Sequence, residues 1–356
     1  MSEPIRSDHA VMPGCAERSS MYLNRNGKIL MGALTTLVLV TIIAVVWVIF
    51  GRGKEVGEVT SVGSSSTSDR AVESTKTSSL QELTNPSRSE LWNSTKSLVE
   101  KSPSLLKSCE DAAGLTKIHL FHDTSPFLFN RGAPRTVLLV DNGAVEEALK
   151  WAGERHKKVM LVAFADNSEP AGHYQGEAGG QEEDISRKTT LAYALDPKLG
   201  VQSRNFFPIC SGQEHKCIIS KDVRILWEKT SDGYRELDEK PKIDVVAVPA
   251  VSRSSNPECF QNNDQFTGIG SHMVSKRIEL QFQAAQKESA QVLVTGAFGC
   301  GLHRYDPQLV AQHFKATLFK FGKECPETVV FAIPKAFGRD AYDAFEKELR
   351  NMLSTE

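Results

Sequence analysis

Adjacent carboxylates at the start of a helix are the residues in this chain best suited to acid chemistry. Two glycines, Gly179 and Gly180, lead into the segment Gln181-Glu182-Glu183. The apolar residues that follow have helical spacing, which puts the acids at a helix N-terminus, where the dipole favours negative charge. A carboxyl group whose pKa is raised by a nearby negative charge can serve as a general acid. The simpler interpretation is that the acids only cap the helix.

A glycine-rich loop comes directly before these acids. Residues 158–165 form an apolar run typical of a buried strand, and residues 166–180 contain Pro170 and Gly172 among several further glycines. A strand that runs through such a loop into a helix N-terminus forms a cradle for an anion such as phosphate. The first loop therefore predicts a ligand that carries phosphate.

A second glycine-rich loop follows another buried strand, over residues 291–295. Its sequence is Gly296-Ala297-Phe298-Gly299-Cys300-Gly301. Glycines let a ligand approach the backbone closely, and ligands of α/β proteins bind at the carboxyl edge of the sheet. A tight turn that requires glycine is the simpler interpretation, and the spacing is not that of a dinucleotide-binding fingerprint.

Strands and helices alternate from about residue 115, which predicts an α/β domain. The continuously apolar strands are typical of a sheet covered by helices on both faces. The predicted strands are 136–140, 158–165, 223–227, 243–248, 291–295 and 328–333. The predicted helices are 143–153, 185–195, 275–289, 307–321 and 341–353. Residues 196–220 are expected to be irregular and 254–270 to form a polar loop.

The N-terminal part of the chain has a different character. Residues 29–50 are apolar and uncharged, and at about 1.5 Å per residue they span roughly 30 Å, which predicts one transmembrane helix in a lipid bilayer. Basic residues flank both ends, so the charge distribution does not orient this helix. Residues 1–28 form a tail, 51–90 a Ser/Thr-rich flexible linker and 91–114 a helical lead-in to the domain at 115–356.

Composition narrows the classes of partner. The formal net charge is −2 and no long basic stripe is present, so we expect no nucleic acid partner. The seven cysteines include no Cys-x-x-Cys pair, which favours reduced, packed thiols and gives no metal site. We expect no metal and no cofactor.

These segments together resemble a known family. The chain from about 118 to 353 is similar to the macrodomain fold, and specifically to the microbial-type poly(ADP-ribose) glycohydrolases. In that family a strand ends in Asn/Asp-Phe-Ala, a Pro-Gly-Gly-Gly loop follows, and Gln-Glu-Glu comes after a short gap. Here the corresponding segments are Ala163-Phe164-Ala165-Asp166, Pro170-Ala171-Gly172-His173 and, after a gap of seven residues, Gln181-Glu182-Glu183. Gly296 to Gly301 matches the family's second loop.

The resemblance implies a macrodomain-like three-layer α/β/α domain with a mixed central sheet, whose cleft binds ADP-ribose or an ADP-ribosylated protein. It implies that Glu183 protonates the leaving oxygen of the ribosyl bond and that Glu182 holds ribose hydroxyls. The implied substrate-binding residues are Asp166, Gly172, Gln181, Gly296, Ala297, Phe298, Gly299, Cys300, Gly301 and His303. Because ADP-ribose chemistry is mostly cytosolic, we expect a single-pass membrane protein whose C-terminal domain is on the cytoplasmic side.

Departures from the family pattern leave two functions open. Ala171 and His173 replace two of the family's three glycines, and a side chain at either position could crowd a diphosphate. After the second loop the family has an aromatic residue where this chain has His303. The chain is therefore either a membrane-anchored ADP-ribose-removing hydrolase or an inactive ADP-ribose-binding or scaffold module.

Overall fold

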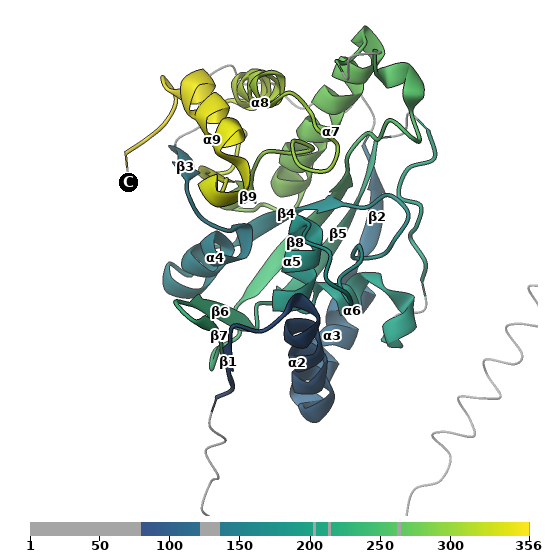
Figure 1. The fold of residues 1–356 in the computed structure, drawn as a ribbon, viewed down its shortest axis with the longest axis vertical. Coiled ribbons are helices and arrows are strands. Elements are labelled where there is room, and N and C mark those ends of the chain that lie inside the picture. The colour runs from purple at the N-terminus through teal and green to yellow at the C-terminus, as the bar shows by residue number, and fades with distance from the viewer. Residues whose placement is uncertain (1–79, 122–135, 202–203, 213–214, 262–264, 356) are drawn as a thin grey trace, which may run out of the picture. The chain divides into compact units, whose positions relative to one another are not determined.

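The central element of the domain is a seven-stranded sheet (Figure 1). The computed structural model describes residues 80–121, 136–201, 204–212, 215–261 and 265–355. In spatial order the strands are β2 (Lys117–Leu120), β5 (Lys216–Arg224), β8 (Lys242–Pro249), β4 (Val159–Ala165), β9 (Val292–Thr295), β10 (Thr328–Ala332) and β3 (Thr136–Val140). The β2–β5 and β5–β8 pairs are antiparallel, and the other neighbours are parallel. The sheet is therefore mixed, which confirms the prediction.

Helices cover both faces of this sheet. On one face lie α2 (Arg88–Lys101), α3 (Pro103–Leu115), α4 (Ala144–Leu149), α5 (Gln181–Lys188) and α6 (Leu191–Leu195). On the other lie α7 (Gly268–Lys287), α8 (Pro307–Phe321) and α9 (Lys335–Leu349). A π-helical turn, η1 (Lys150–Glu154), continues α4, and two short 3₁₀ turns are η2 (Pro197–Leu199) and η3 (Pro257–Cys259).

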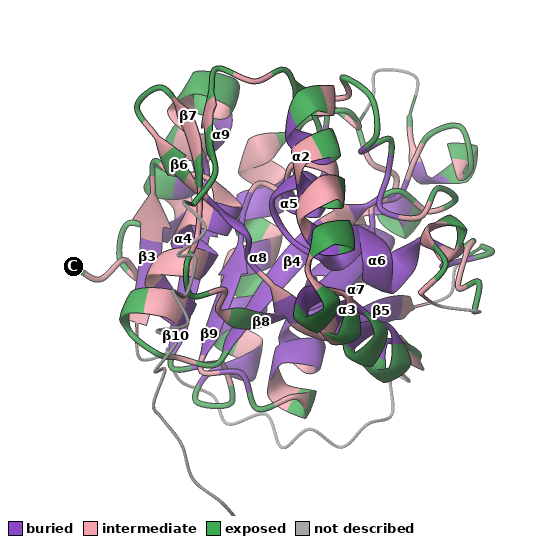
Figure 2. Ribbon diagram, turned by 90° about the horizontal axis from the view of Figure 1, so that it is seen from below, coloured by how far each residue is buried: buried purple, intermediate pink, exposed green. Residues whose placement is uncertain are grey.

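Strand β4 shows why the central strands are apolar throughout. Leu161 and Ala163 pack into the core shared with α2 to α6, whereas Met160 and Val162 pack into the core shared with α7 to α9. Side chains alternate between the two faces of a strand, and here both faces are covered, so each position is apolar. Figure 2 shows the sheet as buried between the two layers of helices.

A small second sheet and two helices at the start of the described chain belong to the same domain. The order of this sheet is β1 (Glu82–Thr84), β7 (Gly233–Glu236) and β6 (Trp227–Thr230). Leu91, Trp92 and Val99 of α2 are buried in the core beside the central sheet. The described domain therefore includes residues that the sequence predicts as linker and lead-in, because these helices bury apolar side chains that the sheet needs covered.

Four predicted boundaries differ from the structure. Strand β5 starts at Lys216, within the segment predicted to be irregular, because a bulge between Ser220 and Val223 interrupts its alternating pattern. The helix predicted over 185–195 is two helices, since the Thr189 hydroxyl bonds to the Ile185 carbonyl and accepts from the Leu191 amide. Helix α7 begins earlier than predicted, at Gly268, and α9 is shifted towards the N-terminus, at Lys335–Leu349.

Candidate functional site

The candidate site lies where the parallel strands end. Strands β4, β9 and β10 are neighbours, so the loops after them meet at one edge of the sheet. An added Cβ at Gly296 would lie 2.7 Å from the Ala332 carbonyl oxygen, which shows how closely the ends of β9 and β10 approach. The Asp166 carboxylate after β4 acts electrostatically on His303, so the loops after β4 and β9 also lie near each other.

Gln181 fastens the first turn of α5 to strand β4. Its amide oxygen accepts from the Phe164 amide at 2.8 Å, and its amide nitrogen donates to the Val162 carbonyl at 2.7 Å. Strand β9 pairs with β4 only as far as Leu161, whereas β8 stays paired to its end. Beyond Leu161, the Gln181 side chain thus takes the place of β9 as the hydrogen-bond partner of the β4 backbone. Its role in the structure is to place the two glutamates at the end of the sheet.

Glu182 points into the domain and is 2% exposed. One carboxyl oxygen accepts from the Asp166 amide at 2.6 Å, and Oε1 has no hydrogen-bond partner within the described residues. Burial raises the pKa of this carboxyl well above its usual 4.5, and the charges of Glu183 and Asp166 raise it further, against the effect of the Asp166 hydrogen bond. A buried polar atom without a partner is costly, so a ligand hydroxyl at Oε1 would be stabilising.

Glu183 is half-buried and lies against the backbone of two glycines. Its Oε1 accepts from the His173 amide at 3.1 Å. An added Cβ at Gly172 would lie 2.5 Å from Glu183 Oε1 and 3.2 Å from Glu182 Oε2, and one at Gly180 would lie 2.1 Å from Glu183 Oε2. Both carboxyl groups therefore converge on Gly172, and each of the two glycines makes room for the Glu183 carboxylate.

The loop after β4 turns through two consecutive residues with left-handed backbones. Ala171 and Gly172 both have left-handed backbones, with φ of 62° and 64°. Ala171 is fully buried and packs in the hydrophobic core, so its methyl group does not face a ligand. Asp166 is exposed, and its Oδ1 accepts from the Ser168 and Glu169 amides, which fixes the start of the loop.

The loop after β9 is held by aromatic packing. Phe298 is fully buried, and its ring meets the Phe164 ring edge-on at 5.5 Å. Gly299 has φ of 75°, and an added Cβ would lie 2.2 Å from the Tyr305 ring. Tyr305 is itself held by a 2.5 Å hydrogen bond from its hydroxyl to the Val251 carbonyl. Two residues predicted to bind substrate, Phe298 and Gly299, therefore shape the loop from inside.

The other residues of this loop lie nearer the surface. Ala297 and Cys300 are half-buried, and burial raises the pKa of the Cys300 thiol to about 12, which keeps it neutral. Gly301 has open space where a Cβ would be. His303 is half-buried, and desolvation lowers its pKa while the Asp166 carboxylate opposes that shift. His303 therefore stays largely neutral near pH 7, beside Asp166.

Sequence reasoning missed two features of this edge. Leu302 is 90% exposed and Phe337, which follows β10, is 87% exposed, so both offer apolar surface to a ligand. The cue in the sequence is an aromatic residue in a Pro-Lys-Ala-Phe-Gly segment directly after a buried strand. Asn167 was also missed: its side chain bonds to both the amide and the carbonyl of Cys210, which ties the loop after β4 to the segment before β5.

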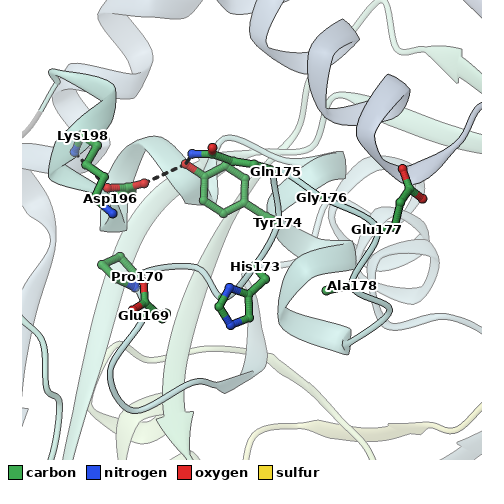
Figure 3. Close-up of a pocket in the computed structure, with 11 residues that line it drawn as sticks. Glu169, Pro170, His173, Tyr174, Gln175, Gly176, Glu177, Ala178, Asp196 and Lys198 are labelled. Atoms are coloured by element: carbon green, nitrogen blue, oxygen red, sulfur yellow. Dashed lines mark hydrogen bonds between the residues drawn. The ribbon is translucent and has the colours of Figure 1, made fainter.

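A hollow of about 340 Å³ lies beside the first loop (Figure 3). Gly172 and His173 line it, together with Tyr174, Asp196 and Lys198, but the two glutamates do not. Within it the Tyr174 hydroxyl donates to Asp196 at 2.8 Å. The hollow therefore shares Gly172 and His173 with the surroundings of Glu183 but does not include the carboxyl groups.

Two further predictions concern metals and the membrane. Across the described ranges, no group of three or more His, Cys, Asp or Glu side chains is placed to hold a metal ion. The six cysteines in those ranges are free thiols. The predicted transmembrane helix at 29–50 lies outside the described residues, and no helix inside them is long and apolar enough to cross a bilayer.

Comparison with known proteins identifies the fold. Residues 66–228 match the family model of the microbial-type PARG catalytic domain, where PARG denotes poly(ADP-ribose) glycohydrolase. The poly(ADP-ribose) glycohydrolase of Thermomonospora curvata superposes with a TM-score of 0.56 at 21% identity, over 73% of this chain and 98% of that one. The domain has the fold of these glycohydrolases. The T. curvata enzyme bound to the inhibitor ADP-HPD gives a TM-score of 0.59 at the same identity and coverage.

A second glycohydrolase supports the same assignment. The Deinococcus radiodurans enzyme in complex with ADP-ribose gives a TM-score of 0.55 at 20% identity, over 69% of this chain and 98% of that one. No match was found among curated proteins. The matched segment 66–228 includes helices α2 and α3, so the glycohydrolase-like domain starts well before residue 115.

Proposed function

We propose that the chain is an ADP-ribosyl hydrolase that removes ADP-ribose from modified proteins at the carboxyl edge of the sheet. The observation that carries this proposal is the pairing of a buried, unpartnered Glu182 oxygen with the more accessible Glu183 carboxyl at the start of α5. In a domain with a glycohydrolase fold, a ribose hydroxyl would satisfy Glu182 and leave Glu183 free to act on the ribosyl bond.

Glu183 acts as the general acid in this proposal. Its proton passes to the oxygen that leaves the anomeric carbon of the ribose, and the carbon–oxygen bond breaks to give an oxocarbenium-like centre. Water attacks that centre and returns a proton to the Glu183 carboxylate. A single carboxyl group transfers the proton in both steps, whereas ordinary glycosidases use two carboxyl groups that flank the scissile bond.

The two loops supply the rest of the binding site. The amides of Gly301 and His303 make no hydrogen bond to described residues, so they are free to bind phosphate oxygens. Phe337 and Leu302 offer the apolar surface that an adenine ring would stack on. Ala171 does not obstruct this site, because its methyl group is in the core, whereas the exposed His173 side chain marks the mouth of the loop.

A binding module without turnover is the competing function, and one experiment separates the two. Calorimetry with ADP-ribose is combined with hydrolysis of an ADP-ribosylated protein, for the wild type, Glu183→Gln and Glu182→Gln. We expect Glu183→Gln to abolish turnover and to leave affinity within a few-fold, and Glu182→Gln to weaken binding. Binding without turnover in the wild type would support the binding module and reject the hydrolase. The absence of binding at millimolar ADP-ribose would reject both functions.

The membrane anchor is a separate part of the proposal. We propose that residues 29–50 hold the chain in a bilayer as a single-pass protein, with the domain on the cytoplasmic side. The support is the length and apolarity of that segment. Protease treatment of intact cells tests it: protection of the domain is expected, and its digestion would place the domain outside.

A further inference from the structure

Helix α5 holds the loop that carries His173 through hydrogen bonds. The Arg187 guanidinium, which is 2% exposed, donates to the carbonyls of Tyr174, Gly176 and Ala178 at 2.7 to 2.9 Å. Glu183, four residues earlier on the same helix face, accepts from the His173 amide. One helix therefore holds the loop at its start through Glu183 and along its length through Arg187.

Helix α2 holds the same loop from the other side. The Glu177 carboxylate accepts from the amides of Arg88 and Ser89 at 3.2 and 3.0 Å and from the Ser89 hydroxyl at 2.6 Å. The Arg88 guanidinium donates back to the Glu177 carbonyl at 2.8 Å. A carboxylate on the first amides of a helix is stabilised by the helix dipole, and the Ser89 bonds in particular lower the pKa of Glu177.

Two further residues, Gly179 and Thr95, contribute to the contact between α2, the loop and α5. An added Cβ at Gly179 would lie 2.8 Å from the Arg88 guanidinium, so a larger residue there would displace the end of the Arg88 side chain. The buried Thr95 hydroxyl of α2 donates to the Arg187 carbonyl at 2.5 Å and accepts from Trp227 Nε1 at 2.7 Å. Thr95 therefore joins α2 to α5, which fixes the distance between the two helices that hold the loop.

We propose that the N-terminus of α2, acting through Glu177, is a positioning element of the active site that fixes where the His173 amide meets Glu183. This inference rests on the proposed function, since it assigns Glu177, Ser89 and Arg187 the role of holding the acid's loop in place. None of the three is a catalytic residue. A ligand-approaching loop held on both sides loses little conformational entropy when substrate binds, and a displacement of about 1 Å at a reacting group costs up to about a hundredfold in rate.

The test compares two carboxylates at the same end of α2 in the full-length chain. Glu177→Ala releases the loop. Glu90→Ala is the matched control: Glu90 is exposed, accepts from the Ser87 amide at 2.7 Å in the cap of α2, and makes no hydrogen bond to described residues 172–180. Hydrogen exchange of amides 172–180 is measured together with kcat and KM for an ADP-ribosylated protein. Glu177→Gln keeps one acceptor oxygen and should recover part of the effect.

We expect faster exchange over 172–180 and a kcat about tenfold lower with KM within about twofold for Glu177→Ala, and neither change for Glu90→Ala. Equal exchange in the two variants would overturn the proposal. Faster exchange with an unchanged kcat would overturn it too, because the loop would then be held without positioning the acid. A wild-type chain without hydrolase activity would reject the proposed function, and the exchange comparison would still decide whether α2 holds the loop.

Discussion

Substitution of Gly172 by alanine tests the geometry of the paired glutamates most directly. The new methyl group would be placed 2.5 Å from Glu183 Oε1, 2.9 Å from its Cδ and 3.2 Å from Glu182 Oε2. These atoms are at the end of a flexible side chain, so the fold survives and the carboxylate moves. We expect a displacement of about 1 Å and, from it, a loss of about a hundredfold in turnover.

The stability cost follows from the backbone. Gly172 has φ of 64°, and an alanine in the left-handed region costs about 1–2 kcal/mol. For a domain of this size that corresponds to a fall in Tm of roughly 2–4 °C per kcal/mol. Ala171 already adopts φ of 62°, so the fold tolerates this conformation in a non-glycine residue.

Gly176→Ala is the matched control in the same loop. It has nothing within 4 Å of an added Cβ and no positive φ, so we expect its turnover and Tm to match the wild type. The assays are hydrolysis of an ADP-ribosylated protein, calorimetry with ADP-ribose and thermal unfolding. Equal turnover in Gly172→Ala and Gly176→Ala would refute the reasoning, since it would mean that the Glu183 carboxylate does not need its observed position.

Three other predictions concern stability. The pKa of the Glu182 carboxyl is raised above 4.5 in the folded chain, so on raising the pH the unfolded chain loses the Glu182 proton first. The free energy of unfolding of the wild type should therefore fall relative to that of Glu182→Gln from about pH 4.5 to neutrality. Parallel pH profiles of the two free energies, measured by urea unfolding, would contradict this. Thr95→Val leaves Trp227 Nε1 without its acceptor and should cost about 1–3 kcal/mol, whereas Thr95→Ser should cost less, as measured by urea unfolding. A chain of residues 80–356 should fold by circular dichroism, and one of 116–356, which lacks α2 and α3, should not, because their buried side chains belong to the core.

Local pattern was enough to predict most of the elements of the domain. The strand at 136–140 and the helix at 307–321 have the predicted bounds, because an uninterrupted apolar run and a helical apolar stripe each report one local structure. The first part of strand β5 was predicted to be irregular, since its bulge places Lys221 and Asp222 inside the strand. Bulges depend on the partner strand, which a local pattern does not contain.

In the candidate site, too, local sequence predicted some features, and others depended on tertiary packing. The spacing of the first loop, Gln181-Glu182-Glu183 and the Gly296–Gly301 loop carried the resemblance to the microbial-type poly(ADP-ribose) glycohydrolases, and the fold of the domain agrees with that resemblance. The resemblance gave both glutamates roles but did not say which of them is desolvated. That depends on which one points into the core, and only the packing of α5 on β4 through Gln181 settles that Glu182 does.

The sequence by itself determined the kinds of residue that reach the carboxyl edge of the sheet and their order along the chain. The tertiary structure decided how they are held. Gly179 and Gly180 precede the acids as one motif, yet Gly179 makes room for Arg88 of a helix 91 residues away and Gly180 for Glu183. Those requirements come from side chains that approach through space, and the conformational freedom of a glycine carries no record in sequence of which neighbour needs it.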